Sequence, residues 1–271
     1  MSDDPTRPRL GGMALANGLL VHGPRHWAAA VRTPDGDVAV RVGRKLRLTG
    51  GPVGSVPLVR GVLRLAEAMA VLPAVRTRTP HARFAMESGS TGAGMVVSFL
   101  GTAASRRVFR SPVSQELAAA AFGLVPALIG LRGSPAAAWH AVEHKSIAAY
   151  EEGGPAEVAN AGAHPKEHPR CGSNLVLPLV ATSTAANIAL RVVSRRPGNG
   201  SRAAAAAVGA GLAVEAMAFA LRNPGHPLAR LVHASGHLIQ ARFVTREPDP
   251  ADMEVGRRAM EALMRAEGVE P

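Results

Sequence analysis

The sequence predicts a mainly α fold in which Ala-rich helical hairpins, transmembrane or buried, accompany a small β-hairpin region near the N-terminus. Hydrophobic residues make up 47% of the 271 residues but aromatic residues only 3%, so the apolar content is mostly Ala, Val and Leu. Such composition suits closely packed helices, including membrane helices, which tolerate small residues at their contacts. Residues 175–193 and 203–221 are long apolar stretches, and Asp35-Gly36 between two apolar runs is a strong hairpin signal.

The N-terminal region has β-like runs and then changes to helical spacing. Residues 27–32 and 37–42 are expected to be strands joined by the turn Thr33-Pro34-Asp35-Gly36. Residues 60–72 carry apolar side chains three and four positions apart. This spacing predicts an amphipathic helix that ends at Pro73.

Three apolar stretches in the middle of the chain are candidates for membrane spans. They are residues 117–131, 175–193 and 203–221, and the last two approach the roughly 20 apolar residues that a span needs. Glu215 lies inside the third stretch, where a carboxylate costs on the order of 2.5–3.5 kcal/mol by insertion scales. Residues 91–104 are shorter and rich in Gly and Ser. The alternative to membrane insertion is an Ala-rich helical hairpin buried in a soluble core.

Two similar connectors suggest how the helices are paired. Ser105-Arg106-Arg107 precedes the apolar stretch at 117, and Ser194-Arg195-Arg196 precedes the stretch at 203. If each connector joins two helices, both Arg-bearing tips lie on one side and the polar segments on the other. We expect a multi-pass protein of the cell membrane with its polar face in the cytoplasm. The positive-inside rule does not decide the orientation, because both sides are basic.

The chain is expected to have four parts. They are a disordered tail at 1–10, a β-hairpin with an amphipathic helix at 11–86, a helical membrane-type region at 87–222 and a C-terminal tail at 223–271. The third part carries a candidate site at 132–173.

The C-terminal tail is expected to end in a helix over residues 250–267, capped by Asp249 or Asp252. An apolar stripe on this helix needs a partner surface, and its residues are Met253, Val255, Met260, Leu263 and Met264.

Charge and cysteine content exclude several classes of protein. The formal net charge is +11 and the isoelectric point is about 11.4, but the Arg residues are scattered and no nucleic-acid-binding motif accompanies them. We therefore expect membrane lipids as partners and no nucleic acid. Protein partners are not indicated by the sequence. One cysteine excludes an intramolecular disulfide framework and fits a reducing compartment.

The first candidate site is the pentad from His140 to His144. Two imidazoles four residues apart project from the same face of a helix, so they can bind one ion. The order H-x-x-E-H matches the inverzincin pattern, in which Glu143 would be the general base. The pattern alone is weak, and taken by itself it has a structural role more often than a catalytic one.

A second pair of ligand-type residues follows about thirty positions later. His168 and Cys171 flank a turn-forming Pro169. With His140 and His144 they would complete a tetrahedral shell of three nitrogens and one sulfur, which suits a divalent metal, zinc first. A closed shell is structural, whereas a shell with one ligand absent leaves a position for water and permits catalysis. The alternative is that His168 caps a turn and Cys171 is a small buried hydrophobe.

Four other polar residues have simpler interpretations than metal binding. Glu151 could be a third ligand, a partner for a histidine N–H, or a solvated helix end, and the last is the commonest case. Lys145 is expected to be a surface charge or a carboxylate partner. His233 and His237 are expected to contribute auxiliary polar packing.

Several motifs are spread over nearly the whole chain. They are Gly11-Gly12, Pro57-Leu58-Val59-Arg60-Gly61 with Glu67, His140-x-x-Glu143-His144-Lys145 with Tyr150-Glu151, His168-Pro169-Arg170-Cys171-Gly172, and Gln240 with Thr245-Arg246-Glu247-Pro248. Together they resemble the YqhQ-like bacterial proteins, an uncharacterised family described as predicted metal-dependent enzymes and integral membrane proteins. Met13, Asn17 and His22 stand where the family has Gln, Glu and Arg, so roles of those family side chains do not carry over.

Two functions follow from the motifs and the resemblance. One is a metal-dependent membrane hydrolase that uses a metal-activated water with Glu143 as base. The other is a non-enzymatic membrane scaffold or partner-binding protein, in which the His/Cys cluster is a structural metal site or a hydrogen-bonded staple.

Overall fold

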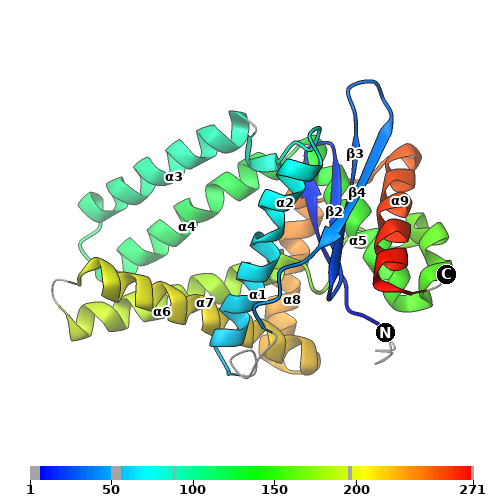
Figure 1. The fold of residues 1–271 in the computed structure, drawn as a ribbon. Coiled ribbons are helices and arrows are strands. Elements are labelled where there is room, and N and C mark those ends of the chain that lie inside the picture. The colour runs from blue at the N-terminus through cyan, green and yellow to red at the C-terminus, as the bar shows by residue number, and fades with distance from the viewer. Residues whose placement is uncertain (1–6, 50–55, 88, 195–196, 270–271) are drawn as a thin grey trace.

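The computed structural model describes residues 7–49, 56–87, 89–194 and 197–269, and there a four-stranded antiparallel sheet stands beside a set of helices (Figure 1). The strands lie across the sheet in chain order, as Gly11–Leu15 (β1), Gly18–His22 (β2), His26–Arg32 (β3) and Val38–Arg44 (β4). The predicted mainly helical fold with a small N-terminal β region is confirmed, although the region is a four-stranded sheet. Residues 1–6 of the expected disordered tail lie outside the described residues.

The predicted hairpin is the connection between β3 and β4. The Thr33 N–H donates to the Asp37 carbonyl oxygen at 2.8 Å, and Gly36 has a φ of 87°. Only glycine adopts this left-handed conformation without steric cost, which is why the Asp-Gly pair marks the turn.

Both faces of the sheet are buried. Leu19 and Val21 of β2 join the core cluster on one face, while Leu20 between them joins the cluster on the other. The same alternation in β3 places Ala28 on the first face and fully buried Trp27 on the second. Because successive side chains point to opposite faces, a strand covered on both sides has a continuous apolar run.

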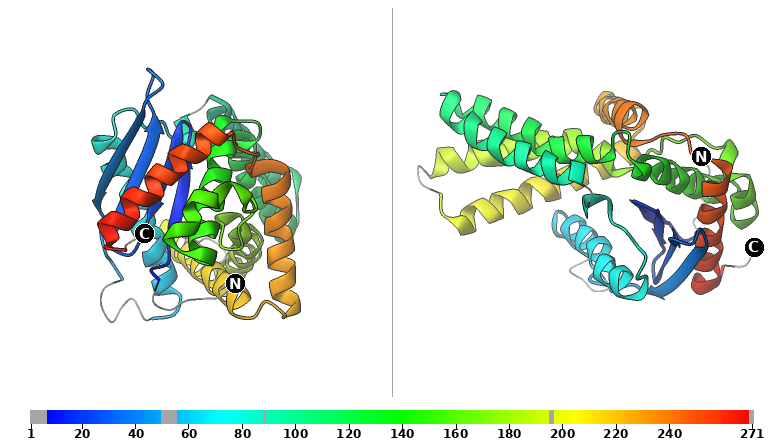
Figure 2. Two further views of the ribbon diagram at one scale, coloured as in Figure 1. Left: turned by 90° about the vertical axis from the view of Figure 1, so that its right-hand side faces the viewer. Right: turned by 90° about the horizontal axis from the view of Figure 1, so that it is seen from above.

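Different helices cover the two faces, as the views in Figure 2 show. Helices α5 (Pro135–Gly153) and α9 (Pro250–Glu267) pack on one face, and α2 (Val71–Arg78) packs on the other. Helix α9 has the predicted bounds, and Asp249 occupies the N-cap position, although its side chain makes no capping hydrogen bond. The partner surface of its apolar stripe is the sheet, where Val255, Met260 and Leu263 are fully buried. The C-terminal helix is therefore packed against the N-terminal strands.

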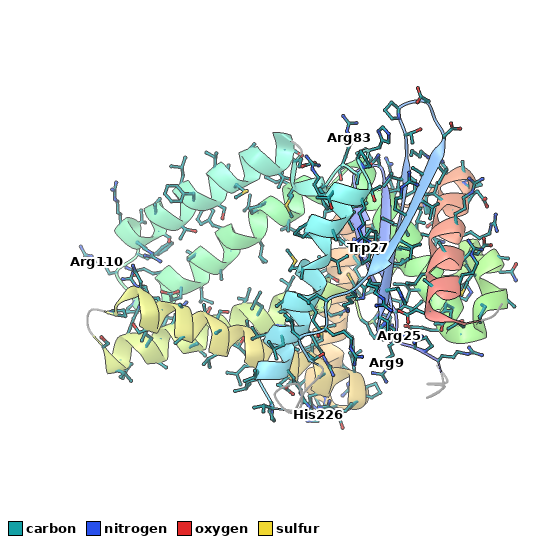
Figure 3. All side chains as sticks on the ribbon, viewed as in Figure 1. Arg9, Arg25, Trp27, Arg83, Arg110 and His226 are labelled. Atoms are coloured by element: carbon teal, nitrogen blue, oxygen red, sulfur yellow. The ribbon has the colours of Figure 1, made fainter. Side chains whose placement is uncertain are left out.

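Four long helices form two antiparallel hairpins that project in the same direction, away from the sheet (Figures 1 and 2). The first pairs α3 (Gly89–Val108) with α4 (Pro112–Leu131), and the second pairs α6 (Val176–Val193) with α7 (Asn199–Arg222). Figure 3 shows Arg110 at the tip of the first hairpin, far from Trp27 in the sheet. This agrees with the expectation that the Arg-bearing tips of the hairpins lie on the side opposite the polar segments of the chain. Residues 195–196 of the second tip lie outside the described residues.

Three helical segments are long and apolar enough to cross a membrane, judged over the described residues. They are Pro112–Leu131, Gly172–Val193 and Asn199–Arg222. Few of their side chains are buried within the chain, and Val192 and Val193 are 82% and 86% exposed. Helix α3 does not meet the same criterion, in line with its Gly and Ser content.

Ion pairs satisfy the acidic groups in the hairpins. The Arg60 guanidinium donates through Nε to Glu215 Oε1 at 2.8 Å, so this carboxylate faces helix α1 (Val59–Met69). Glu116 of α4 accepts a hydrogen bond from the Asn187 amide at 3.0 Å and one from Arg191 at 2.6 Å, both on α6. Pairing within the protein reduces the cost of placing a carboxylate in an apolar helix.

The predicted helix at 60–72 is divided. Helix α1 ends at Met69, and α2 begins at Val71. Pro73 is the third residue of α2 and not the end of α1. Proline is tolerated there because the first-turn N–H groups of a helix have no partner within the helix.

Shorter elements complete the chain. They are the 3₁₀ turns η2 (Ala85–Glu87), η3 (Pro155–Ala163) and η4 (Gly172–Leu175), helix α8 (Pro227–Ile239) and the π-helical turn η5 (Gln240–Val244). Helix α8 lies in the segment expected to be a tail. The proposed division of the chain into four parts stays a prediction.

Glu267 fastens α9 to the sheet. Its Oε1 accepts a hydrogen bond at 2.8 Å from the backbone N–H of Arg25, in the turn between β2 and β3, and one at 2.7 Å from that of His26, the first residue of β3. Burial raises the pKa of the carboxyl, but these backbone N–H groups and the Arg25 side chain outweigh it, and the pKa lies below its ordinary value.

We expect Glu267→Gln to destabilise the protein by about 1–3 kcal/mol at neutral pH, because buried N–H groups lose a charged acceptor.

The stabilisation by Glu267 should also depend on pH. An unfolded Glu takes up a proton near pH ~4.3, whereas the folded carboxylate stays ionised at lower pH, so the contribution of Glu267 to stability is lost on acidification through that range. Thermal unfolding in detergent from pH 7 to 3 should therefore show a smaller loss of Tm for the variant than for wild type. Glu261→Gln on the same helix, in a surface ion pair with Arg257, is the control. Equal acid sensitivity of wild type and Glu267→Gln would contradict the assignment.

Candidate metal centre

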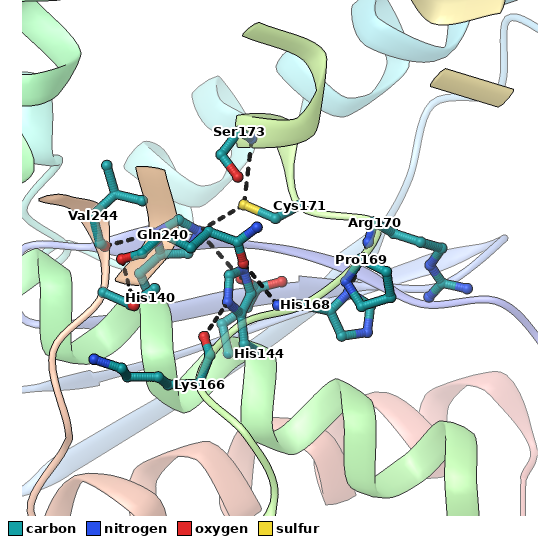
Figure 4. A network of polar contacts seen from close by, with 12 residues as sticks. His140, His144, Lys166, His168, Pro169, Arg170, Cys171, Ser173, Gln240 and Val244 are labelled. Atoms are coloured by element: carbon teal, nitrogen blue, oxygen red, sulfur yellow. Dashed lines mark hydrogen bonds and ion pairs between the residues drawn. The ribbon is translucent and has the colours of Figure 1, made fainter. Parts of the chain in front are cut away.

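Three segments far apart in the sequence meet at one buried site. Helix α5 supplies His140, Glu143 and His144, and the loop before η4 supplies Cys171. The third segment runs from η5 to Glu247 and supplies backbone and side-chain partners. Figure 4 shows their polar contacts.

Helix α5 is buried on all sides. Its side chains from 136 to 150 are buried except that of His140, which is partly buried. Ala residues at 136–138, 141, 148 and 149 allow this, because they let the sheet and other segments approach the helix closely. On the α9 side, a Cβ on Gly256 would lie 2.5 Å from Val142 Cγ1, so only glycine fits there.

Both imidazoles of the pentad are oriented by backbone carbonyl groups. His140 Nδ1 lies 3.0 Å from the Val244 carbonyl oxygen, and His144 Nδ1 lies 2.6 Å from the Lys166 carbonyl oxygen. A carbonyl oxygen can only accept, so each Nδ1 carries the proton and each Nε2 presents its lone pair. Metal-ligating histidines are typically held in this way.

Cys171 completes a group of three ligand atoms. Its Sγ lies 3.4 Å from His140 Nε2 and accepts a hydrogen bond from the Ser173 N–H at 3.5 Å. One ligand atom each from His140, His144 and Cys171 lies within 4.8 Å of the other two. Ligand atoms around a tetrahedral zinc ion lie roughly 3.3–3.6 Å apart, given its usual Zn–N and Zn–S distances. These three side chains could therefore hold a metal ion.

The Glu143 carboxylate lies beside both imidazoles. Its Oε2 is 3.7 Å from His144 Nε2 and 4.0 Å from His140 Nε2. Burial raises the pKa of this carboxyl, although the positive charge of Arg170 opposes the shift. Strand β1 lies directly against it, because a Cβ on Gly12 would be 2.5 Å from Glu143 Cγ.

His168, predicted as a fourth ligand, is not in the group of three. Its Nε2 lies 3.2 Å from Glu151 Oε2, and its Nδ1 accepts from the Arg170 N–H at 3.2 Å. The backbone N–H of His168 donates to Gln240 Oε1 at 2.7 Å. Its ring centroid is still only 5.7 Å from that of His144, so it lies next to the site. Burial lowers the pKa of His168, which favours the neutral imidazole.

Glu151 is neither a third ligand nor a solvated helix end in this structure. It pairs with Arg170 and holds His168, which is the second of the three roles considered for it. Arg170 also donates to the Leu10 carbonyl oxygen at 3.1 Å, which connects this loop to the start of the sheet.

Lys145 is buried, contrary to the expectation of a surface charge, and it is a carboxylate partner. Its Nζ donates to the Gly162 carbonyl oxygen at 3.0 Å and the His164 carbonyl oxygen at 2.8 Å, and pairs with Glu247 at 2.6 Å. It therefore positions both segments that orient the imidazoles. The sequence could show the motif residue but not its acceptors, because backbone carbonyl groups leave no signal in a sequence.

The fold and the site together define the class of protein: a helical protein with long apolar hairpins and a buried His/His/Cys group beside a carboxylate. The profile of a family described as a protein of unknown function, DUF1385, matches residues 136–266, which include the whole site. The chain is 24% identical over 320 aligned positions to "Uncharacterized protein YqhQ" of Bacillus subtilis (strain 168), covering 99% of this chain and 96% of that protein. No solved structure matches it significantly. The two matches support the resemblance to a YqhQ-like family, whose function is unknown.

We expect Lys145→Met to weaken zinc binding 10- to 100-fold, because the segments that carry the two orienting carbonyl groups lose their common donor. Competition against a chromophoric chelator measures the affinity. Lys166→Met is the matched control, because it removes a lysine side chain but keeps the carbonyl group that His144 contacts. Equal affinities for the two variants would show that Lys145 does not position the site.

Proposed function

We propose that this protein is a metal-dependent membrane hydrolase in which His140, His144 and Cys171 hold a divalent ion, zinc first. The observation that carries the proposal is the pair of carbonyl contacts at Nδ1, which leave both Nε2 atoms unprotonated, with that of His140 3.4 Å from the Cys171 sulfur. Two imidazoles and a thiolate are ligands that zinc prefers.

A set of three protein ligands is typical of catalytic zinc sites, whereas structural sites usually have four. With His168 held by Glu151, the described residues supply three, which supports the enzyme over the closed staple. The ion would supply a Lewis acid that makes water a nucleophile at neutral pH.

Glu143 is the proposed general base. Its carboxylate is buried beside both imidazoles and against the backbone of β1, so its position is constrained. It takes a proton from the attacking water and returns it to the leaving group.

Elemental analysis of the purified protein should find about one zinc ion per chain, and His144→Ala should lose most of it. Glu143→Gln should keep the metal and lose activity by a factor of at least about 10² in a panel of ester, amide and phosphoester substrates. His233→Ala, which removes an imidazole outside the group, should retain both.

Other outcomes would support the non-enzymatic scaffold or contradict metal binding. If wild type binds zinc with four protein ligands, and Cys171→Ser unfolds the chain without any variant altering hydrolysis, the scaffold function is supported. Absence of zinc, cobalt, iron and manganese from active wild-type protein would contradict the metal proposal.

We also propose that the hairpins cross the cell membrane, with the site in the cytoplasm. Three apolar segments and their exposed side chains support this.

After alkaline carbonate extraction of cells, we expect the chain in the membrane pellet and its release only by detergent. In a Cys171→Ser background, a membrane-impermeant maleimide should label Ser111→Cys at a hairpin tip in intact cells but not Asp35→Cys in the β3–β4 turn. Recovery in the supernatant without detergent, or the reverse labelling, would contradict these proposals.

A further inference from the structure

An apolar cavity of about 330 Å³ lies between the sheet and the first helical hairpin. Its walls are β1, η2 with Phe84, the start of α3, and the end of α4 from Pro126 to Leu131. His140 also lines it, so the cavity borders the candidate metal centre.

The lining has the chemistry of a site for a hydrocarbon chain. Among the described residues of the wall, Thr91 is the one polar side chain besides His140, and its hydroxyl donates to the Ala85 carbonyl oxygen at 3.1 Å. Met13, Phe84, Met86 and Leu131 supply apolar surface. Pockets with apolar walls of this kind accept apolar ligands, and this volume falls at the lower end of the range for ligand sites.

The cavity connects the membrane region with the site. Ala127 and Leu131 belong to α4, one of the three segments apolar enough to cross a membrane. At the other end, Gly12 lines the cavity and also lies directly against the Glu143 side chain. A chain that enters from the bilayer beside α4 would thus place its head near His140 and Glu143.

We infer that the cavity binds the acyl chain of a lipid-like ester or amide whose carbonyl group is hydrolysed at the metal centre. This inference rests on the proposed hydrolase function and names its substrate class. Water oxygen bonds to the acyl carbon, the bond to the alcohol or amine breaks, and the proton that Glu143 takes from water passes to that leaving group. The products are a fatty acid and the free alcohol or amine.

Alkyl hydroxamates test the inference, because their head chelates metal ions and their chain length can be varied. Full-length protein loaded with Co²⁺ in detergent is titrated with acetohydroxamate, hexanohydroxamate and octanohydroxamate, and the visible absorption of Co²⁺ reports binding. Each methylene that enters the cavity should tighten binding by about fourfold, so hexanohydroxamate should bind at least tenfold more tightly than acetohydroxamate.

Ala127→Trp fills the cavity and should abolish the dependence on chain length while acetohydroxamate binding stays unchanged. Ala121→Trp is the matched control, because it lines a separate apolar cavity between α3 and α4 that does not include His140. It should retain the wild-type dependence. A flat series in wild type, or the same dependence in both variants, would overturn the inference while leaving the metal site intact.

A second measurement does not depend on the metal. A fatty acid with a photoreactive diazirine at its chain end, added to metal-free full-length protein in vesicles, should crosslink to residues 84–86 and 126–131 in wild type and in Ala121→Trp. Ala127→Trp should lose this labelling. Absence of the crosslinks in wild type would overturn the cavity assignment, whereas crosslinks without Co²⁺ binding would refute the proposed metal chemistry alone.

Discussion

The burial of α5 is the constraint on which the rest of the structure depends. The charged and imidazole side chains of a helix covered on every side find partners only within the protein, because a buried polar group without a hydrogen bond costs about 1–3 kcal/mol. His140, His144 and Lys145 are on this helix, and each finds backbone carbonyl groups as acceptors. Those carbonyl groups belong to two other segments, so the requirement to satisfy α5 determines where the segments lie. The arrangement of the candidate site follows from it.

The sheet and α9 supply the cover that makes this burial complete. Val255, Met260 and Leu263 of α9 pack into the same cluster as Trp139 and Val142 of α5. Glu267 fixes the end of α9 to the turn before β3. The first and last parts of the chain thus cooperate to enclose a helix from its middle, and Gly12 and Gly256 mark the places where they approach α5 most closely.

Specific ion pairs hold the second hairpin to α1 and the two hairpins to each other. Arg60 on α1 meets Glu215 on α7, and Arg191 on α6 meets Glu116 on α4. Most of the remaining hairpin surface is apolar and exposed, which is the expected state of helices that have lipid as their neighbour. The end of α4 reaches the core beside His140, so the apolar region and the candidate site share one boundary.

Local signals in the sequence determined much of this protein. Helical spacing and caps predicted α9 to its terminal residues, the Asp-Gly turn predicted β3 and β4, and the i, i+4 imidazoles with a later cysteine predicted the group of His140, His144 and Cys171. Only the tertiary structure decided that His168 faces Glu151, that Lys145 is buried, and that both sheet faces are covered. The physical reason is that spacing along a helix or turn is set by backbone geometry, which is local. The partner of a buried polar group is set by whichever distant segment brings an acceptor within hydrogen-bonding distance, and no local pattern records that choice.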